Sequence, residues 1–185
     1  MSLTTATPGQ LGTQAPAFSL LGVDDQIWSL KSFAGSKVLV IVFMCNHCPY
    51  VIAVQERMNR LARDFSSRGV RWVGINSNDA VEYPEDSFEA MKIRARKQSF
   101  VFPYLQDSTQ EVARAYGAVC TPEFYAYRND SSGFVLEYKG RLDDHWKDEK
   151  QVSRKDLSLA LEAILLGQHP HSDQKPSIGC SIKWK

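Results

Sequence analysis

The fold of this chain is decided by the stretch Val38-Leu39-Val40-Ile41-Val42-Phe43-Met44-Cys45-Asn46-His47-Cys48-Pro49. Its apolar run does not alternate with polar residues, which predicts a strand over residues 37–43 that is buried on both faces in the middle of a sheet. Apolar residues then recur at spacings of three and four, which predicts a helix over about residues 48–66. Cys45 and Cys48 therefore stand between a central strand and the helix that follows it.

The spacing of these two cysteines indicates redox chemistry. Thiols at positions i and i+3 on the first turn of a helix are close enough to form a disulfide, and the helix N-terminus favours a thiolate. Zinc also favours this spacing, but a closed structural site usually needs a second pair of ligands. The other cysteines, Cys120 and Cys180, are far apart and form no ligand-spaced pair with a histidine. We therefore expect thiol–disulfide exchange, with no metal and no organic cofactor.

Length and charge limit the classes of protein that fit. The chain has 185 residues with 43% hydrophobic content, enough for one domain with a full core and some extensions. Its 22 basic and 21 acidic side chains give a net charge of +1, so nothing favours nucleic acid or an anionic membrane as partner. No apolar run approaches a membrane span, and the N-terminus lacks the pattern of a secretory signal. The expected location is the cytoplasm.

The remaining elements follow from alternation, helical periodicity and turn residues. We expect one hairpin around the turn at residues 22–25 and a second across residues 129–132. A further strand is expected over residues 70–76, and further helices over about residues 84–98, 109–116 and 153–166. Residues 1–15 are expected to form a flexible lead-in, and residues 168–185 a tail beyond the closing helix.

This order of elements resembles the thioredoxin fold over residues 16–167. The N-terminal hairpin and the strand and helix inserted between Cys48 and Pro122 resemble the peroxiredoxin and TlpA-like branches. The segments 43–50, 83–87, 120–122, 140–144 and 179–184 are similar to a group of peroxiredoxin-like (AhpC/TSA) bacterial proteins. The resemblance implies an α/β fold in which helices flank a mixed central sheet, with an N-terminal β-hairpin, a peroxiredoxin/TlpA-type insertion and a C-terminal tail.

Two family patterns fit the cysteine motif and differ in the thiol that reacts. In the thioredoxin pattern, Cys45 is the exposed attacking thiol and Cys48 the resolving one. In the peroxiredoxin pattern, Cys48 takes the peroxidatic position, Cys45 replaces the family's threonine and Ile41 its proline. The family's arginine is expected near the strand at 123–127, where this chain has Thr121-Pro122. Peroxide cleavage needs an oriented peroxide and a nearby cation, so these substitutions favour the thioredoxin pattern.

The resemblance also gives roles to residues around the thiols. It implies a cis Thr121–Pro122 bond beside the cysteines, with the Thr121 backbone free to pair with an extended substrate. His47 is expected to stabilise a thiolate and make the disulfide more oxidising, the alternative being a solvent-facing side chain. Cys120 is expected to be a packing residue, the alternative being a redox thiol. The buried acid of thioredoxin should lie near Leu39, where no carboxylate occurs.

Two clusters of acidic residues are predicted to lie on the solvated surface and not to form a catalytic or metal site. One comprises Asp79, Glu82, Glu85, Asp86 and Glu89, expected at a wet helix entry, and the other is the loop Asp143-Asp144-His145. In the tail, Ile178, Cys180, Ile182 and Trp184 alternate with small or polar residues, which predicts an extended segment docked by one apolar face. Cys180 is then expected to point inward as a packing residue, the alternative being a third redox thiol that resolves Cys45 or Cys48.

The sequence therefore predicts a thiol–disulfide oxidoreductase with Cys45 and Cys48 as its catalytic pair and an antioxidant role as an extension of that activity. The alternatives are a thiol peroxidase using Cys48, and a non-enzymatic metal carrier using Cys45, Cys48 and a distant histidine. The expected partners are a protein or small-molecule thiol or disulfide and a thiol electron donor.

Overall fold

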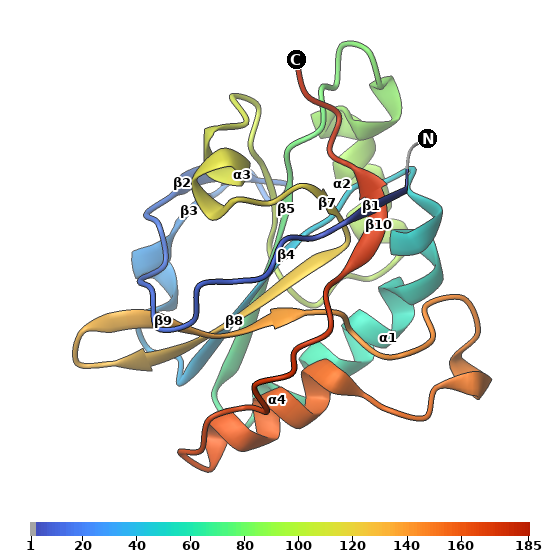
Figure 1. The fold of residues 1–185 in the computed structure, drawn as a ribbon. Helices are drawn as coiled ribbons and strands as arrows, with labels where there is room; N and C mark the ends of the chain where they lie inside the picture. The colour runs from blue at the N-terminus through green and yellow to red at the C-terminus, as the bar shows by residue number, and fades with distance from the viewer. Residues whose placement is uncertain (1–2) are drawn as a thin grey trace.

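A seven-stranded mixed sheet forms the centre of the computed structural model, which describes residues 3–185 (Figure 1). Its strands, in spatial order, are β3 (Ile27–Ser29), β2 (Ser19–Gly22), β6 (Tyr104–Gln106), β5 (Val70–Asn76), β4 (Val38–Phe43), β8 (Glu123–Asp130) and β9 (Gly133–Gly140). Strand β4 pairs parallel with β5 and antiparallel with β8, so the predicted apolar strand does lie in the middle of the sheet. The two predicted hairpins are β2–β3 and β8–β9.

Helices cover both faces of the sheet, which is why β4 is apolar without alternation. They are α1 (Pro49–Ser66), α2 (Phe88–Lys97), α3 (Glu111–Tyr116) and α4 (Asp156–Leu165), with short 3₁₀ turns η1 (Leu30–Phe33), η2 (Pro84–Asp86) and η3 (Glu149–Gln151). Val38, Val40 and Val42 belong to one buried cluster with residues of α1, α2 and α4. The intervening β4 residues belong to a second cluster, with residues of η1 and α3.

Helix α1 begins directly after the cysteine motif. Cys48 is its N-cap residue in an extended conformation, and Pro49 occupies the first turn, where its missing N–H costs nothing. The helix ends at Ser66, and Gly69 follows with a φ of +91°, a conformation that favours glycine. The predicted helix over about residues 48–66 is therefore confirmed. The two cysteines, however, lie in the connection from β4 and precede the first turn of the helix, on which they were expected.

A second, three-stranded sheet joins the two ends of the chain. Strand β10 (Ile178–Ser181) lies between β1 (Leu3–Thr5) and β7 (Cys120–Thr121), antiparallel to both (Figure 1). The flexible lead-in expected for residues 1–15 is therefore wrong for Leu3–Thr5, because β10 supplies a backbone partner that the local sequence does not reveal. Residues 1 and 2 lie outside the described residues.

The single helix predicted over about residues 84–98 is two elements in the structure. The 3₁₀ turn η2 ends at Asp86, and Ser87 then caps α2, its side chain accepting a hydrogen bond from the backbone N–H of Ala90 at 3.4 Å. Because of this break, the Asp86 side chain turns into the protein instead of facing solvent. Within residues 3–185, no helix is both long and apolar enough to cross a membrane.

Candidate active site

Cys45 and Cys48 meet the loop that carries Thr121 and Pro122. The Cys48 sulfur lies 3.1 Å from the Thr121 carbonyl oxygen, to which its thiol form donates, and the Cys45 sulfur lies 3.4 Å from Thr121 Oγ1. The Thr121–Pro122 bond is cis, as the resemblance implied. The structure thus brings together four of the predicted site residues, although the two cysteines lie more than 70 positions from Thr121 in the sequence.

Neither thiol is exposed. Cys45 is 1% exposed and Cys48 is 0% exposed. The expectation that Cys45 is an exposed attacking thiol is therefore wrong, since Thr121, Cys48 and Asp86 all interact with its sulfur. Thr121 is not free to pair with a substrate either, because its backbone pairs with Cys180 of β10.

The pKa values of the two thiols are shifted in opposite directions. A hydrogen bond donated by Cys45 is the main cause that lowers the pKa of Cys48 to about 5, and a hydrogen bond from Cys180 and the N–H groups of Val51 and Cys180 act in the same direction. Burial opposes this shift without cancelling it. The pKa of Cys45 is raised well above its usual value by its hydrogen bond to Cys48, by burial and by the charge of Asp86. Cys48 is therefore the more acidic of the two thiols.

His47 forms an ion pair beside Cys45. Its Nδ1 atom lies 2.7 Å from Oδ2 of Asp86 and 3.8 Å from Oε1 of Glu85, while its ring stacks on Tyr83 with centroids 5.4 Å apart. The contact with Asp86 is a charge contact, not a well-aligned hydrogen bond. Asp86 raises the pKa of His47 and outweighs the opposing effect of burial. The solvent-facing alternative for His47 does not fit this arrangement.

Asp86 is the site residue that the sequence analysis missed. It is 1% exposed, and its carboxylate accepts hydrogen bonds from the Asn46 backbone at 2.6 Å and the Asn78 side chain at 2.7 Å. Burial raises its pKa, but these bonds and His47 outweigh burial and lower the pKa overall. A signal was present in the sequence, because Asn78 follows the carboxyl end of β5, the edge where open α/β sheets hold their sites.

Three potential metal ligands converge at the same point. The sulfur of Cys45, a ring nitrogen of His47 and a carboxylate oxygen of Asp86 all lie within 4.8 Å of one another. Thiolate, imidazole and carboxylate are all ligands for zinc, although a closed zinc site takes four. The metal-carrier alternative assumed a histidine distant in sequence, whereas the histidine found here, His47, lies within the motif itself.

Cys120 belongs to a separate buried cluster. Its sulfur lies 3.6 Å from Oε2 of Glu123, which forms an ion pair with Lys139 at 3.0 Å. Burial is the main cause that raises the pKa of the Cys120 thiol, and Glu123 adds to it. These surroundings favour the packing role. The cluster also contains a buried carboxylate, that of Glu123 on β8.

The C-terminal tail, residues 168–185, packs against the site, but fewer of its apolar side chains are buried than the sequence predicts. Cys180 and Ile182 are each 3% exposed, whereas Ile178 is 45% exposed. The predicted apolar face is therefore wrong at Ile178, because this first residue of β10 lies at the rim of the groove described next. Burial and the hydrogen bond to Cys48 raise the pKa of Cys180 to about 12.

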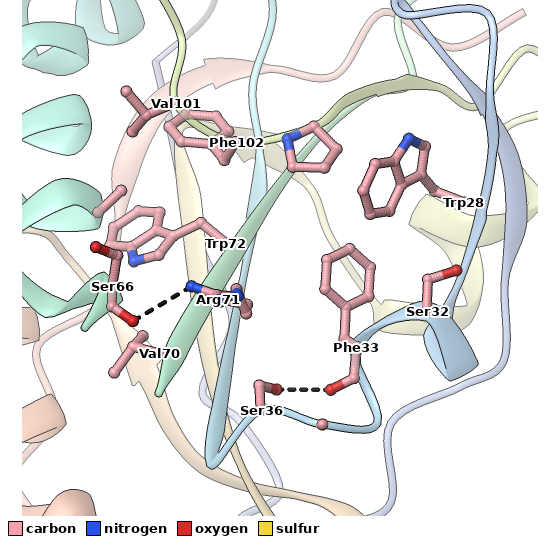
Figure 2. A pocket seen from close by; sticks show the side chains of 13 residues that line it. Trp28, Ser32, Phe33, Ser36, Ser66, Val70, Arg71, Trp72, Val101 and Phe102 are labelled. Atoms are coloured by element: carbon pink, nitrogen blue, oxygen red, sulfur yellow. Dashed lines mark hydrogen bonds between the residues drawn. The ribbon is translucent and has the colours of Figure 1, made fainter. Parts of the chain in front are cut away.

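Two hollows differ in their relation to the thiols. A groove of about 100 Å³ runs past Pro122, Trp146 and Ile178, directly beside the site. A larger pocket of about 390 Å³, shown in Figure 2, is lined by Trp28, Phe33 and Trp72 among others. It lies near the start of β5, at the opposite end of the sheet from the thiols.

The loop Asp143-Asp144-His145 is not simply solvated. Asp143 is buried and pairs with the buried Arg57 at 2.5 Å. Arg57 also donates to the carbonyl oxygens of His145 and Trp146, so it fixes this loop against α1. Asp143 also lines the groove beside Pro122, so the pair with Arg57 holds one part of the groove wall in place.

This mixed sheet with its adjoining dithiol defines a thioredoxin-fold protein with a thiol-based redox function. The AhpC/TSA family model matches residues 11–144, and the chain belongs to that family. A Mycobacterium tuberculosis protein whose name assigns it provisionally to the peroxiredoxins is 28% identical over 142 residues, which cover 75% of this chain and 83% of that protein.

Two solved structures resemble the chain over nearly its whole length, and a third resembles it over about two thirds. An uncharacterized conserved protein from Geobacillus kaustophilus is 45% identical with a TM-score of 0.93, covering 100% of this chain and 97% of that one. A hypothetical protein from Sinorhizobium meliloti is 38% identical with a TM-score of 0.92, covering 98% of both chains. A thiol:disulfide interchange protein of the thioredoxin family from Chlorobium tepidum is 25% identical with a TM-score of 0.55, covering 69% and 85%.

Proposed function

We propose that this chain is a thiol–disulfide oxidoreductase in which Cys48 attacks and Cys45 resolves. The observation that carries the proposal is the set of donors around the Cys48 sulfur at the start of α1, namely the Cys45 thiol and the backbone N–H groups of Val51 and Cys180. Such donors stabilise a thiolate, which is the nucleophile in thiol–disulfide exchange. The proposal reverses the roles that the thioredoxin pattern gives to the two thiols.

The reaction has two steps in the reducing direction. The Cys48 thiolate attacks one sulfur of a substrate disulfide, forming a mixed disulfide and releasing the other substrate sulfur as a thiolate. Cys45 then attacks the Cys48 sulfur, its proton passes to the departing substrate sulfur, and the Cys45–Cys48 disulfide forms. Two electrons thus pass from the protein thiols to the substrate, and a thiol donor returns them.

The substrates in this proposal are protein or small-molecule disulfides, the electron donor is a thiol, and the location is the cytoplasm. The groove past Pro122 and Trp146 adjoins Thr121, whose carbonyl oxygen contacts Cys48. This groove is open to solvent, whereas the sulfur atoms of Cys45 and Cys48 are buried. A substrate bound there would lie beside the proposed nucleophile.

A thiol peroxidase using Cys48 is the second candidate, favoured by membership of the AhpC/TSA family and by the lowered pKa of Cys48. Two observations disfavour it. Cys45 and Ile41 stand where the family pattern has threonine and proline. In addition, no hydrogen bond or ion pair in the described part of the chain joins an arginine to either motif thiol. We expect oxidation by hydrogen peroxide to be slow, and rapid sulfenic acid formation at Cys48 in stopped-flow measurements would reverse this ranking.

Single-cysteine traps test the assignment of roles. Each variant, Cys45→Ser or Cys48→Ser, is incubated with glutathione disulfide, and the glutathione adduct is located by peptide mass spectrometry. We expect a stable adduct on Cys48 in Cys45→Ser, and formation on Cys45 in Cys48→Ser that is slower by about tenfold or more, because that thiol stays protonated. Cys120→Ser is the matched control and should behave as the wild type. Faster reaction at Cys45 would restore the thioredoxin assignment.

A further inference from the structure

The tail strand β10 passes unusually close to the site loop. In its register Cys180 stands opposite Thr121, and Ser181 opposite Cys120. A Cβ atom added to Gly179 would clash with the carbonyl oxygen of Thr121, so this approach requires glycine immediately before Cys180. The sequence Gly179-Cys180 is therefore matched to the loop against which it lies.

Contacts on both sides of Cys180 hold the strand in place. Before it, the Ser177 hydroxyl donates to the Gly140 carbonyl oxygen at 2.7 Å. After it, the Ile182 N–H donates to the Val119 carbonyl oxygen at 3.0 Å and the Lys183 N–H to Asn78 Oδ1 at 2.9 Å. Cys180 is thus in a fixed position and not on a fraying end.

Cys180 and Cys48 meet at the same residue. The Thr121 carbonyl oxygen that β10 approaches is the one that lies 3.1 Å from the Cys48 sulfur. Cys48 and Cys180 belong to one buried cluster, and their thiols form a hydrogen bond. The two thiols are therefore neighbours in the folded chain.

We propose that Cys180 is a third redox-active residue, which opens a second route for resolving mixed disulfides at Cys48, beside direct attack by Cys45. The inference rests on the proposed function, because it needs Cys48 as the attacking thiol. Once Cys48 holds a mixed disulfide, the Cys180 thiol attacks the Cys48 sulfur, its proton passes to the departing substrate thiolate, and a Cys48–Cys180 disulfide forms. Cys45 then attacks the same Cys48 sulfur, which yields the Cys45–Cys48 disulfide and restores the Cys180 thiol.

The position of β10 gives this step a structural basis. The resemblance to thioredoxin-like proteins implies that an extended substrate pairs with the residue before the cis proline, which is Thr121 here. In this chain Cys180 of β10 occupies that pairing position. The tail thus presents Cys180 to Cys48 as a substrate cysteine would be presented. Cys120, beside Glu123, has no such relation to the motif and serves as the comparison thiol.

Disulfide mapping tests the proposal. The full-length Cys45→Ser variant is reduced, treated with one equivalent of diamide, which accepts two electrons, and mapped by mass spectrometry of its peptides. We expect a Cys48–Cys180 disulfide in Cys45→Ser and in Cys45→Ser/Cys120→Ser. We expect none in Cys45→Ser/Cys180→Ser. A Cys48–Cys120 disulfide, or only disulfides between molecules, would overturn the proposal.

Two further measurements separate the proposal from its premise and from misfolding. If the wild type forms the Cys45–Cys48 disulfide but Cys45→Ser forms no Cys48–Cys180 disulfide, the role of Cys180 fails while the proposed function stands. If neither disulfide forms, both fail. Gly179→Val in the Cys45→Ser background keeps the remaining thiols but displaces β10. We expect it to slow Cys48–Cys180 formation by about tenfold and to speed alkylation of Cys48, and equal rates would overturn the role of β10.

Discussion

The Nδ1 atom of His47 lies 2.7 Å from Oδ2 of Asp86, and together with the Cys45 sulfur these groups form a cluster whose members lie within 4.8 Å. Asp86 raises the pKa of His47, and the pKa of Asp86 is itself lowered overall. The two groups therefore form an ion pair beside the Cys45 thiol when His47 is protonated. Because the charges balance, the redox couple should respond in opposite directions when one partner is removed.

Redox potentials test this balance. We expect the Cys45–Cys48 couple to be more oxidising than that of thioredoxin, roughly −270 mV, because its reduced form is stabilised as a thiolate. His47→Ala leaves the Asp86 charge uncompensated and should make the potential more negative by roughly 10 to 30 mV. Asp86→Asn should shift it the other way. Equal potentials in a glutathione titration of the wild type and both variants would show that the pair does not act on the thiols.

Titration of the thiolate tests the assignment of Cys48. The ultraviolet absorbance of a thiolate should show one group ionising near pH 5 in the reduced wild type. Cys48→Ser should abolish this transition. Cys45→Ser should move it to higher pH, because the variant removes the thiol donor that most lowers the pKa of Cys48. Cys120→Ser should leave it unchanged. A transition that persists in Cys48→Ser would assign the thiolate to another cysteine.

The same pKa makes stability depend on pH. A thiol whose pKa falls from its usual value near 9 to about 5 on folding adds stability that is complete above about pH 9 and is lost as pH falls through about 5. The loss in unfolding free energy caused by Cys48→Ser should therefore be larger at about pH 8 than at about pH 6. Urea denaturation of both proteins measures this difference, and a loss independent of pH would contradict the lowered pKa.

Removal of the tail should destabilise the protein without removing its redox couple. Truncation after Gly167 deletes β10, exposes the surface that Ile182 covers and leaves β1 without its partner. Each buried aliphatic side chain contributes about 1.5 to 3 kcal/mol, so the melting temperature should fall by roughly 5 °C or more. The Cys45–Cys48 disulfide should still form. An unchanged melting temperature would show that the docked tail contributes nothing to stability.

Metal analysis tests the carrier alternative. Protein purified under reducing conditions should contain no stoichiometric zinc or copper, because the raised pKa of Cys45 keeps it as a thiol while His47 is engaged with Asp86. Elemental analysis and a zinc titration measure this. Binding of one equivalent that is lost in Cys45→Ser but kept in Cys120→Ser would instead establish a metal site at the motif.

The sequence by itself determined the central elements. The apolar run of β4, the periodicity of α1 and the turn residues of both hairpins are local patterns, so they predicted those elements close to their observed bounds. The cysteine spacing likewise predicted two interacting thiols next to α1, although both precede its first turn instead of lying on it. These features depend on residues within a few positions of one another.

Only the tertiary structure decided which thiol is acidic and what covers it. The Asp86 carboxylate accepts a hydrogen bond from the backbone N–H of Asn46, which lies 40 positions away in the sequence. Asp86 also belongs to a segment whose charged residues predict exposure to solvent. Cys180 meets Thr121 through a strand pairing that no local pattern specifies. Periodicity shows which face of an element is apolar, but not which distant element will pack against it. The acidity of a thiol depends on those distant donors and charges, which come together only in the folded chain.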